Sequence, residues 1–144
     1  MTLTFVDAGV LIAAARGGDE QARRAMTVLD DPDREFAASA LLRLEVMPQA
    51  AFNRRGPETA FYEAFFASVT TWATDLATIV SAAESEASTY GVEAMDALHV
   101  AAAANAGAAE LITTEKPTRS IHRARAIRIV TLYPMEPASG RSER

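Results

Sequence analysis

The sequence predicts an α/β fold in which a central parallel sheet is flanked by helices. Short apolar runs typical of buried strands recur along the chain, and segments with helical spacing of apolar residues lie between them. Strands that alternate with helices in this way indicate a parallel sheet. With 144 residues, 49% of them hydrophobic, the chain is long enough to form one domain with its own core.

The first strand and two helices are expected before residue 30. Residues 3–6 are apolar and short, as in a buried strand, and residues 9–15 begin a helix that Gly17-Gly18 ends. Asp19 is a plausible N-cap for a second helix that reaches about Leu29. A polar, proline-containing turn follows and separates these elements from the second strand.

The second strand is expected at residues 35–38, where Ser39 can cap the helix that follows. This helix contains Pro48 and is expected to end near Phe52, before a loop at residues 54–57. The next helix is rich in aromatic side chains, which follow helical spacing and are expected in the core or at a partner interface: Phe61, Tyr62, Phe65 and Phe66.

The second half of the chain is expected to complete the sheet. A break at Gly91 separates two helices, and the last two strands are joined by a short irregular stretch. The expected strands are 70–73, 110–113 and 127–132, and the expected helices are 76–90 and 93–105. Residues 134–144 show no periodicity and are expected to be disordered, so the predicted domain spans residues 1–133.

Four acidic residues stand beside apolar sequence, where a carboxylate carries a desolvation cost: Asp7, Glu45, Asp96 and Glu115. Asp7 and Glu115 follow the ends of two strands, and ligands gather outside the carboxyl ends of parallel strands. Glu45 shares the inward face of its helix with neighbouring leucines. Asp96 lies in the first turn of its helix, where the positive helix end favours the ionised form. We expect the four carboxylates to meet in one pocket.

An all-oxygen cluster without cysteine is the donor set that Mg²⁺ or Mn²⁺ prefers, and such a site can promote in-line attack of water on a phosphodiester. Taken singly, each acid is more often a surface, capping or ion-paired residue. Their joint placement favours the metal most for Asp7 and Asp96, then for Glu45, and least for Glu115. His99 is expected to be a packing residue, and Glu93 a helix-start carboxylate.

Charge and composition limit the partners. The formal net charge of −5 argues against a general nucleic-acid coating protein, but acids around a metal contribute to that total. The chain has no cysteine, no secretory signal pattern and no run of membrane-span length, so we expect a cytoplasmic protein without a membrane partner. One dense basic run follows Glu115 and either holds RNA phosphates or forms a solvated surface: Arg119, His122, Arg123, Arg125 and Arg128.

Four segments carry a resemblance to a known family: TFVDAGVLIAAA, ASALLRLEVM, YGVEAMDALHVAAAANAGAAELITTEK and IRIVTL. Over residues 3–132 the chain resembles the PIN-domain family, and within it the VapC-type toxin ribonucleases of bacterial toxin–antitoxin pairs. The resemblance implies a three-layer PIN-like fold, a Mg²⁺- or Mn²⁺-dependent endoribonuclease, an RNA substrate, a cognate antitoxin and a homodimer.

The resemblance also implies roles for single residues. It makes Asp7, Glu45, Asp96 and Glu115 the metal-binding and catalytic acids, one of which positions the attacking water. It gives Thr113 the task of orienting a carboxylate or water. RNA contacts would fall to the basic residues after the last acid, of which we single out Arg119, Arg123 and Arg125.

Two other functions stay open. Many relatives carry Ser or Thr just after the first aspartate and an aspartate as the last acid, whereas this chain has Ala8 and Glu115. A catalytically silent PIN-like protein that binds RNA or protein is therefore one alternative. An acidic-pocket phosphotransfer protein, such as a receiver or phosphatase, is a weaker one, because no second aspartate follows Asp7.

Overall fold

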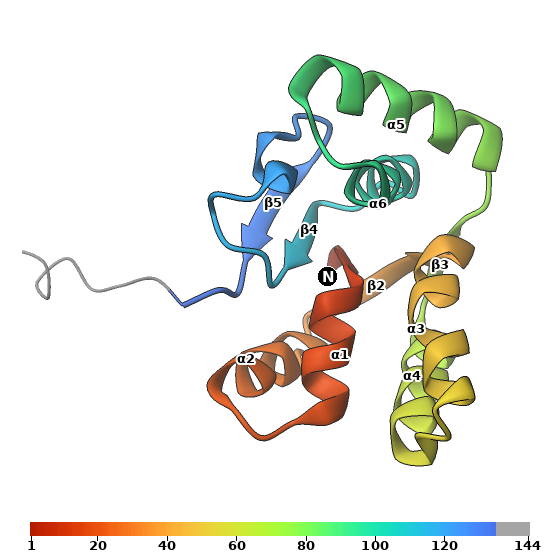
Figure 1. The fold of residues 1–144 in the computed structure, drawn as a ribbon, viewed down its shortest axis with the longest axis vertical. Coiled ribbons are helices and arrows are strands. Elements are labelled where there is room, and N and C mark those ends of the chain that lie inside the picture. The colour runs from red at the N-terminus through yellow and green to blue at the C-terminus, as the bar shows by residue number, and fades with distance from the viewer. Residues whose placement is uncertain (135–144) are drawn as a thin grey trace, which may run out of the picture.

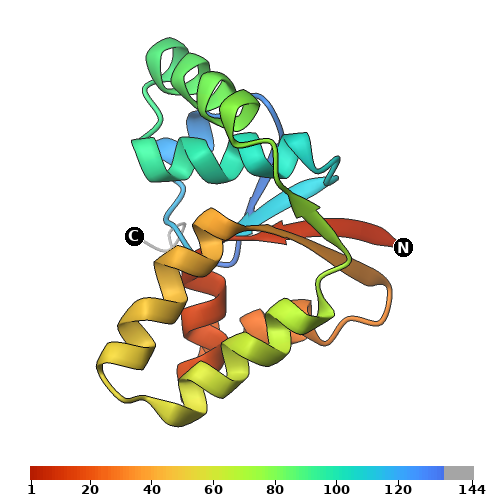
Figure 2. The same ribbon diagram turned by 90° about the vertical axis from the view of Figure 1, so that its right-hand side faces the viewer.

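The computed structural model describes residues 1–134, which fold around one five-stranded, fully parallel sheet. The strand order is β3-β2-β1-β4-β5. Figures 1 and 2 show α5 and α6 on one side of this sheet and α1 to α4 on the other. The predicted three-layer α/β fold with a central parallel sheet is confirmed.

The elements alternate as the apolar pattern predicts. The strands are β1 (Thr2–Val6), β2 (Arg34–Ser39), β3 (Thr71–Ala73), β4 (Glu110–Thr113) and β5 (Arg128–Thr131). The helices are α1 (Ala8–Arg16), α2 (Glu20–Leu29), α3 (Ala40–Phe52), α4 (Gly56–Ser68), α5 (Leu76–Tyr90) and α6 (Ala94–Asn105), with a short 3₁₀ helix η1 (Ser120–Arg123). None of the helices within residues 1–134 is long and apolar enough to cross a membrane.

Helix boundaries follow the capping residues. Asp19 and Ser39 accept hydrogen bonds from the first turns of α2 and α3, as predicted. Gly91 ends α5 in the left-handed conformation, with φ of 71°. One boundary differs from the prediction: Gly56 and Pro57 begin α4 instead of forming a loop, because proline fits the first helical turn. Of the predicted tail, 134–144, all but Pro134 lies outside the described residues.

The core confirms the prediction for the aromatic helix. Tyr62, Phe65 and Phe66 are buried, and Phe61 packs against the same core from a partly buried position. On the opposite face of the sheet, α6 buries a run of small residues from Ala101 to Ala103. Small side chains bring the backbone of α6 close to the sheet, and this fixes the position of the helix that carries Asp96.

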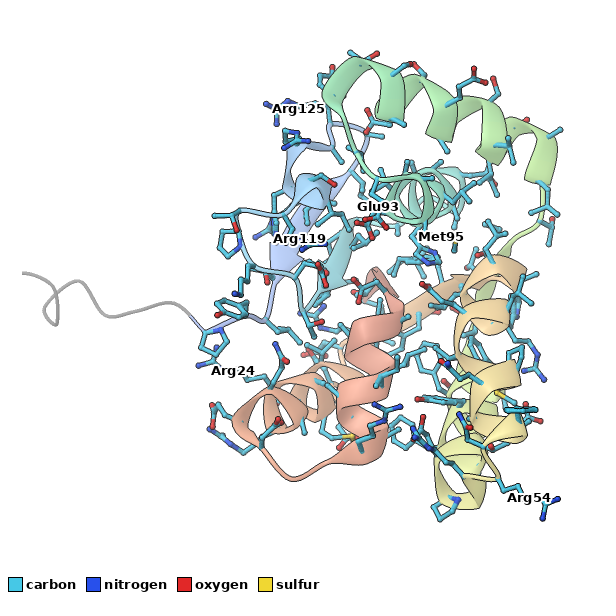
Figure 3. All side chains as sticks on the ribbon, in the orientation of Figure 1. Arg24, Arg54, Glu93, Met95, Arg119 and Arg125 are labelled. Atoms are coloured by element: carbon cyan, nitrogen blue, oxygen red, sulfur yellow. The ribbon has the colours of Figure 1, made fainter. Side chains whose placement is uncertain are left out.

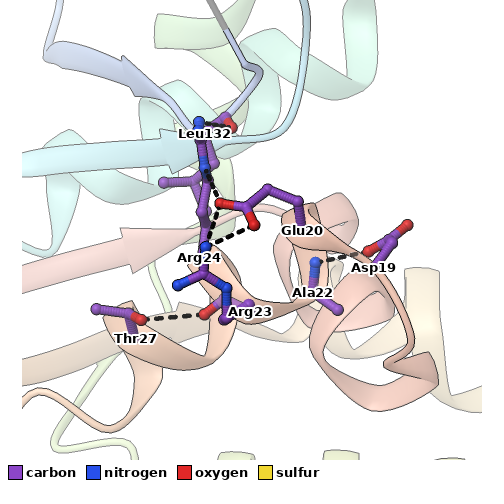
Figure 4. Close-up of polar contacts among 7 residues, drawn as sticks. All are labelled: Asp19, Glu20, Ala22, Arg23, Arg24, Thr27 and Leu132. Atoms are coloured by element: carbon purple, nitrogen blue, oxygen red, sulfur yellow. Dashed lines mark hydrogen bonds and ion pairs between the residues drawn. The ribbon is translucent and has the colours of Figure 1, made fainter.

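A second set of contacts ties α2 to the end of the sheet (Figure 4). Glu20 accepts from both Arg23 and Arg24 within the helix. Arg24 also donates through Nη1 to the carbonyl oxygen of Leu132, 3.3 Å away, just after β5. The residues that leave the sheet are thereby held against the helical layer formed by α1 and α2.

The strand register brings the ends of β1 and β4 together. Val6 lies opposite Ile112, and the backbone N–H of Asp7 donates to the carbonyl oxygen of Ile112 over 3.0 Å. Asp7 and Thr113 are therefore neighbours at the carboxyl edge of the sheet. Parallel sheets concentrate loop-borne groups at this edge, so the register alone assembles the beginning of a site.

Candidate metal centre

Asp7 is held in a buried position between β1 and α1. Its side chain caps α1, with Oδ1 accepting from the N–H of Val10 over 3.2 Å. The Thr113 hydroxyl donates to Oδ2 over 2.5 Å. Only 6% of Asp7 is exposed, and burial raises its pKa to about 6, although the bonds from Thr113 and Val10 oppose that rise. Two neutral donors leave the charge of Asp7 without a cationic partner.

Glu115 follows Thr113 and has a fixed backbone. Its N–H donates to the Thr113 hydroxyl over 3.1 Å, and its carbonyl oxygen accepts from Thr131 and His122 over 2.6 and 3.1 Å. The side chain is freer, with 38% exposed, and pairs with Arg119 over 3.3 Å. Such an exposed ion pair contributes little and exchanges readily. Glu115 is thus available to another cation.

Asp96 lies in the first turn of α6, as predicted, and is half-buried. Its pKa rises to about 6, first through burial and then through repulsion from Glu93 and Glu115, with a smaller contribution from Glu45. Glu93, Glu115 and Glu45 thus raise the pKa of Asp96, and Asp96 in turn raises the pKa of Asp7.

Glu45 reaches this group from α3. Its Oε1 lies 2.7 Å from Nε2 of His99 on α6, and this bond lowers the pKa of Glu45. The prediction that Glu45 faces inward holds only in part, since 36% of its side chain is exposed. The sequence predicts that His99 is a packing residue, and it is buried as expected. It also contacts the Glu45 carboxylate.

Carboxylate oxygens are the donors that a hard divalent cation prefers, but the four carboxylates are not arranged around a single point in the described residues. No three or more histidine, aspartate or glutamate side chains within residues 1–134 are arranged to hold a metal ion directly. Burial raises the pKa of both Asp7 and Asp96, and repulsion from neighbouring acids adds to the rise. A cation bound beside these acids would favour their ionised forms and offset both the burial cost and the repulsion.

A buried acid at the other edge of the sheet shows the contrast. Glu110 accepts from the Thr4 hydroxyl over 3.0 Å and also pairs with the guanidinium of Arg34. Arg34 is in turn held by Asp31 over 3.0 Å. Glu110 has the cationic partner that Asp7 and Asp96 lack, so we assign it a structural role.

The arginines of the predicted basic run have different partners. Arg119 lies near Glu93 beside the acids, whereas Arg125 lies apart from them (Figure 3). Arg125 stacks on the Tyr90 ring at 5.7 Å, and Arg123 donates to the carbonyl oxygens of Tyr90 and Gly91, each over 2.8 Å. Arg123 closes the end of α5, so Arg119 is the arginine of the three best placed for a substrate.

The close approach of Thr114 to Gly9 was not predicted from the sequence. A Cβ atom on Gly9 would lie 2.2 Å from the Thr114 hydroxyl oxygen, so any side chain at position 9 would force the Thr114 side chain to move. Thr114 thus places a hydroxyl beside the first turn of α1, next to Ala8-Gly9, where the sequence itself offers none. A glycine two residues after the strand-end aspartate Asp7 was the available signal.

The chain is similar to known proteins in family and in fold. A family model of the PIN domain matches residues 4–122, the part of the chain that holds all four acids. No curated protein sequence matches significantly.

Among solved structures, a toxin–antitoxin complex from Klebsiella pneumoniae is 20% identical, with a TM-score of 0.68 and coverage of 92% of this chain and 99% of that chain. VapBC2 from Rickettsia felis bound to a promoter DNA fragment is 12% identical, with a TM-score of 0.67 and coverage of 90% and 98%. DNA-bound VapBC from Salmonella typhimurium is 19% identical, with a TM-score of 0.65 and coverage of 91% and 98%. At these identities the likeness shows the fold.

Proposed function

The chain belongs to the PIN-domain family, and we propose that it is a Mg²⁺- or Mn²⁺-dependent endoribonuclease that hydrolyses RNA phosphodiester bonds. One observation carries the proposal: Asp7 and Asp96 are buried or half-buried without a cationic partner among the described residues, and Glu45 and Glu115 lie close enough to Asp96 to raise its pKa. Structural acids in this protein, such as Glu110, have their cation built in.

Each residue has a distinct task in this proposal. A bound divalent cation supplies Lewis-acid stabilisation of charge on the phosphodiester. Asp7 and Asp96 are the less mobile ligands, and Thr113 keeps Asp7 in one orientation. Glu45 and Glu115 are more exposed, so they complete the set of ligands and one of them accepts a proton from the attacking water. Glutamate at position 115 reaches the site across one more methylene than aspartate.

Arg119 is our candidate for the first phosphate contact. Its guanidinium pairs with Glu115 in the described structure, so it already lies at the edge of the acid cluster. When Glu115 turns toward a cation, the guanidinium is released to bind a phosphate oxygen, a partner that suits its planar donors. The contributions of Arg123 and Arg125 to RNA binding are secondary in this view, because both are engaged with the end of α5.

We further propose that the protein is the toxin of a type II toxin–antitoxin pair, acting in the cytoplasm as a homodimer held by a cognate antitoxin. The similarity to VapBC and toxin–antitoxin complexes supports this role. Exposed apolar side chains also support it, because they offer area for partners to cover. Phe52 and Leu44 on α3 are 86% and 69% exposed, and Val80 on α5 is exposed as well.

Cleavage of a defined RNA panel tests the nuclease proposal. We expect cleavage with Mg²⁺ or Mn²⁺, none with a chelator, and a loss of about 100-fold or more in Asp96→Asn. Asp33→Asn removes an exposed carboxylate just before β2, at the opposite end of that strand from the helix that carries Glu45, and should cleave like the wild type. If the wild-type protein cleaves no RNA with either metal, a catalytically silent PIN-like binding protein is the better description.

A further inference from the structure

His99 is buried directly beneath the acid cluster. Only 2% of it is exposed, and its ring packs against Phe5 of β1 with centroids 5.9 Å apart. It lies three residues after Asp96, on the same side of α6. His99 therefore lies in the core between the helical turn that carries Asp96 and the Glu45 carboxylate of α3.

A histidine at this position is costly for the fold. Nδ1 is buried and has no hydrogen-bond partner in residues 1–134. A buried polar atom without a partner destabilises the folded state, and an apolar side chain of similar size would avoid that penalty. The bond from Nε2 does not compensate, because the Glu45 carboxylate is partly exposed and water can solvate it. Packing alone gives no reason for a histidine here.

The hydrogen bond to Glu45 gives that reason. Among the described residues, His99 is the only side chain bonded to Glu45, and the bond spans from α6 to α3. Since its carboxylate is ionised, Glu45 accepts and Nε2–H donates. A glutamate without this partner would sample many rotamers in water, so the bond reduces the conformational entropy that metal binding must overcome.

We propose that His99 is a positioning residue that holds the Glu45 carboxylate toward Asp96 for divalent cation binding. It contacts neither the cation nor the RNA. The inference rests on the proposed metal-dependent function, and it assigns to a buried side chain the role of orienting a ligand from a neighbouring helix. Partners of this kind typically change metal affinity by about 10- to 100-fold.

The test measures Mn²⁺ affinity and thermal stability on the full chain. His99→Phe keeps a ring against Phe5 but removes the donor, and we expect it to bind Mn²⁺ about 10-fold more weakly with an unchanged or higher Tm. His99→Gln keeps an N–H donor at similar reach and should retain most of the affinity. In a Glu45→Gln background, His99→Phe should cause no further loss, because the two residues act through one contact.

Three results would overturn the inference. His99→Phe that binds Mn²⁺ like the wild type would make His99 a packing residue only. Losses from His99→Phe and Glu45→Gln that simply add would show that His99 does not act through Glu45. No Mn²⁺ binding by the wild-type protein would overturn the proposed function and this inference with it. If phenylalanine prevents folding, His99→Leu replaces it in the same cycle with the same expected losses.

Discussion

Thr113 connects two parts of the proposed site through one hydroxyl group. The hydroxyl donates to Asp7 and accepts from the backbone N–H of Glu115, so both of its hydrogen-bonding capacities serve acids of the cluster. The residue is fully buried, which keeps water from replacing either bond. Its position follows from strand register, since Thr113 extends β4 beyond the pair formed by Val6 and Ile112.

Replacing this hydroxyl should shift the pH dependence of cleavage. Thr113→Val keeps the shape of the side chain but removes a bond that lowers the pKa of Asp7, so that pKa should rise above its present value of about 6. Asp7 then loses its proton only at higher pH, and the acidic limb of the profile of kcat/KM against pH should move upward. We also expect a stability loss of about 1 kcal/mol, because the partly buried N–H of Glu115 loses its acceptor.

Thr113→Ser is the matched control for that profile. Serine retains the hydroxyl, so the acidic limb should stay where it is in the wild type. An unchanged limb in Thr113→Val would mean that the hydroxyl does not set the charge state of Asp7.

How far single side chains could be predicted depended on what places them. Asp7 and Asp96 were predictable because a strand end and a first helical turn fix their positions through the backbone. The partner of Glu45 was not predictable, because it depends on side-chain rotamers and on how two helices distant in sequence meet. Arg119 and Glu115 are only four residues apart and form an ion pair. The sequence alone nevertheless did not decide whether this basic run binds RNA phosphates or forms a solvated surface.

The segment between β4 and β5 is held to the α5–α6 pair by several hydrogen bonds. Glu86 of α5 is buried, and its Oε1 accepts from the N–H groups of Arg125 and Ala126 over 2.9 and 2.8 Å. The Ser120 hydroxyl accepts from the N–H of Glu93 at the start of α6 over 3.1 Å. Because this segment carries Glu115 and Arg119, its attachment to α5 and α6 helps to place both beside Asp96.

Removing the Glu86 carboxylate should loosen the segment. In Glu86→Ala two N–H groups lose their acceptor, so we expect a decrease of about 1–3 kcal/mol in the free energy of unfolding, measured by denaturant titration. Amide exchange of Arg125 and Ala126 should become faster. Glu84→Ala, an exposed change two residues away on α5, should leave both quantities near the wild-type values. Equal effects of the two substitutions would contradict the proposed attachment.

Elements were more predictable than their connections. Apolar periodicity and capping residues located each strand and helix to within a few residues, and the parallel sheet followed from their alternation. The segment after β4 was expected to be irregular, and it does contain a short 3₁₀ helix. Its attachment through Glu86 could not be predicted, because nothing local in the sequence distinguishes a buried helical glutamate from the exposed one at position 84.

The buried acids Asp7 and Asp96 make the stability of the whole molecule depend on pH. Asp7 and Asp96 have raised pKa values of about 6, against an ordinary value of 3.8. Between these two pH values the folded chain binds more protons than the unfolded chain. Stability therefore falls as pH rises through about 4 to 6 and stays lower above it. For buried Asp7 the cost is on the order of 2–3 kcal/mol. It is smaller for half-exposed Asp96.

A cation at the acids would reverse this cost, since it interacts with the deprotonated carboxylates. By linkage, Mn²⁺ at 100 times its Kd would add about 2.7 kcal/mol of stability. The same acids that destabilise the metal-free fold above pH 6 would then account for its stabilisation by metal. The central claim is therefore that these acids, which destabilise the metal-free fold, are present because they bind a divalent cation.

Thermal unfolding at pH 7.5, with chelator or with Mn²⁺, tests this claim most directly. Without metal, Asp96→Asn should melt roughly 3–6 °C above the wild type, because it removes about 1–2 kcal/mol of uncompensated charge. Mn²⁺ should raise the Tm of the wild type and of the Asp33→Asn control, but not that of Asp96→Asn. The claim is contradicted if Asp96→Asn is no more stable than the wild type in chelator and Mn²⁺ shifts neither protein, or both equally.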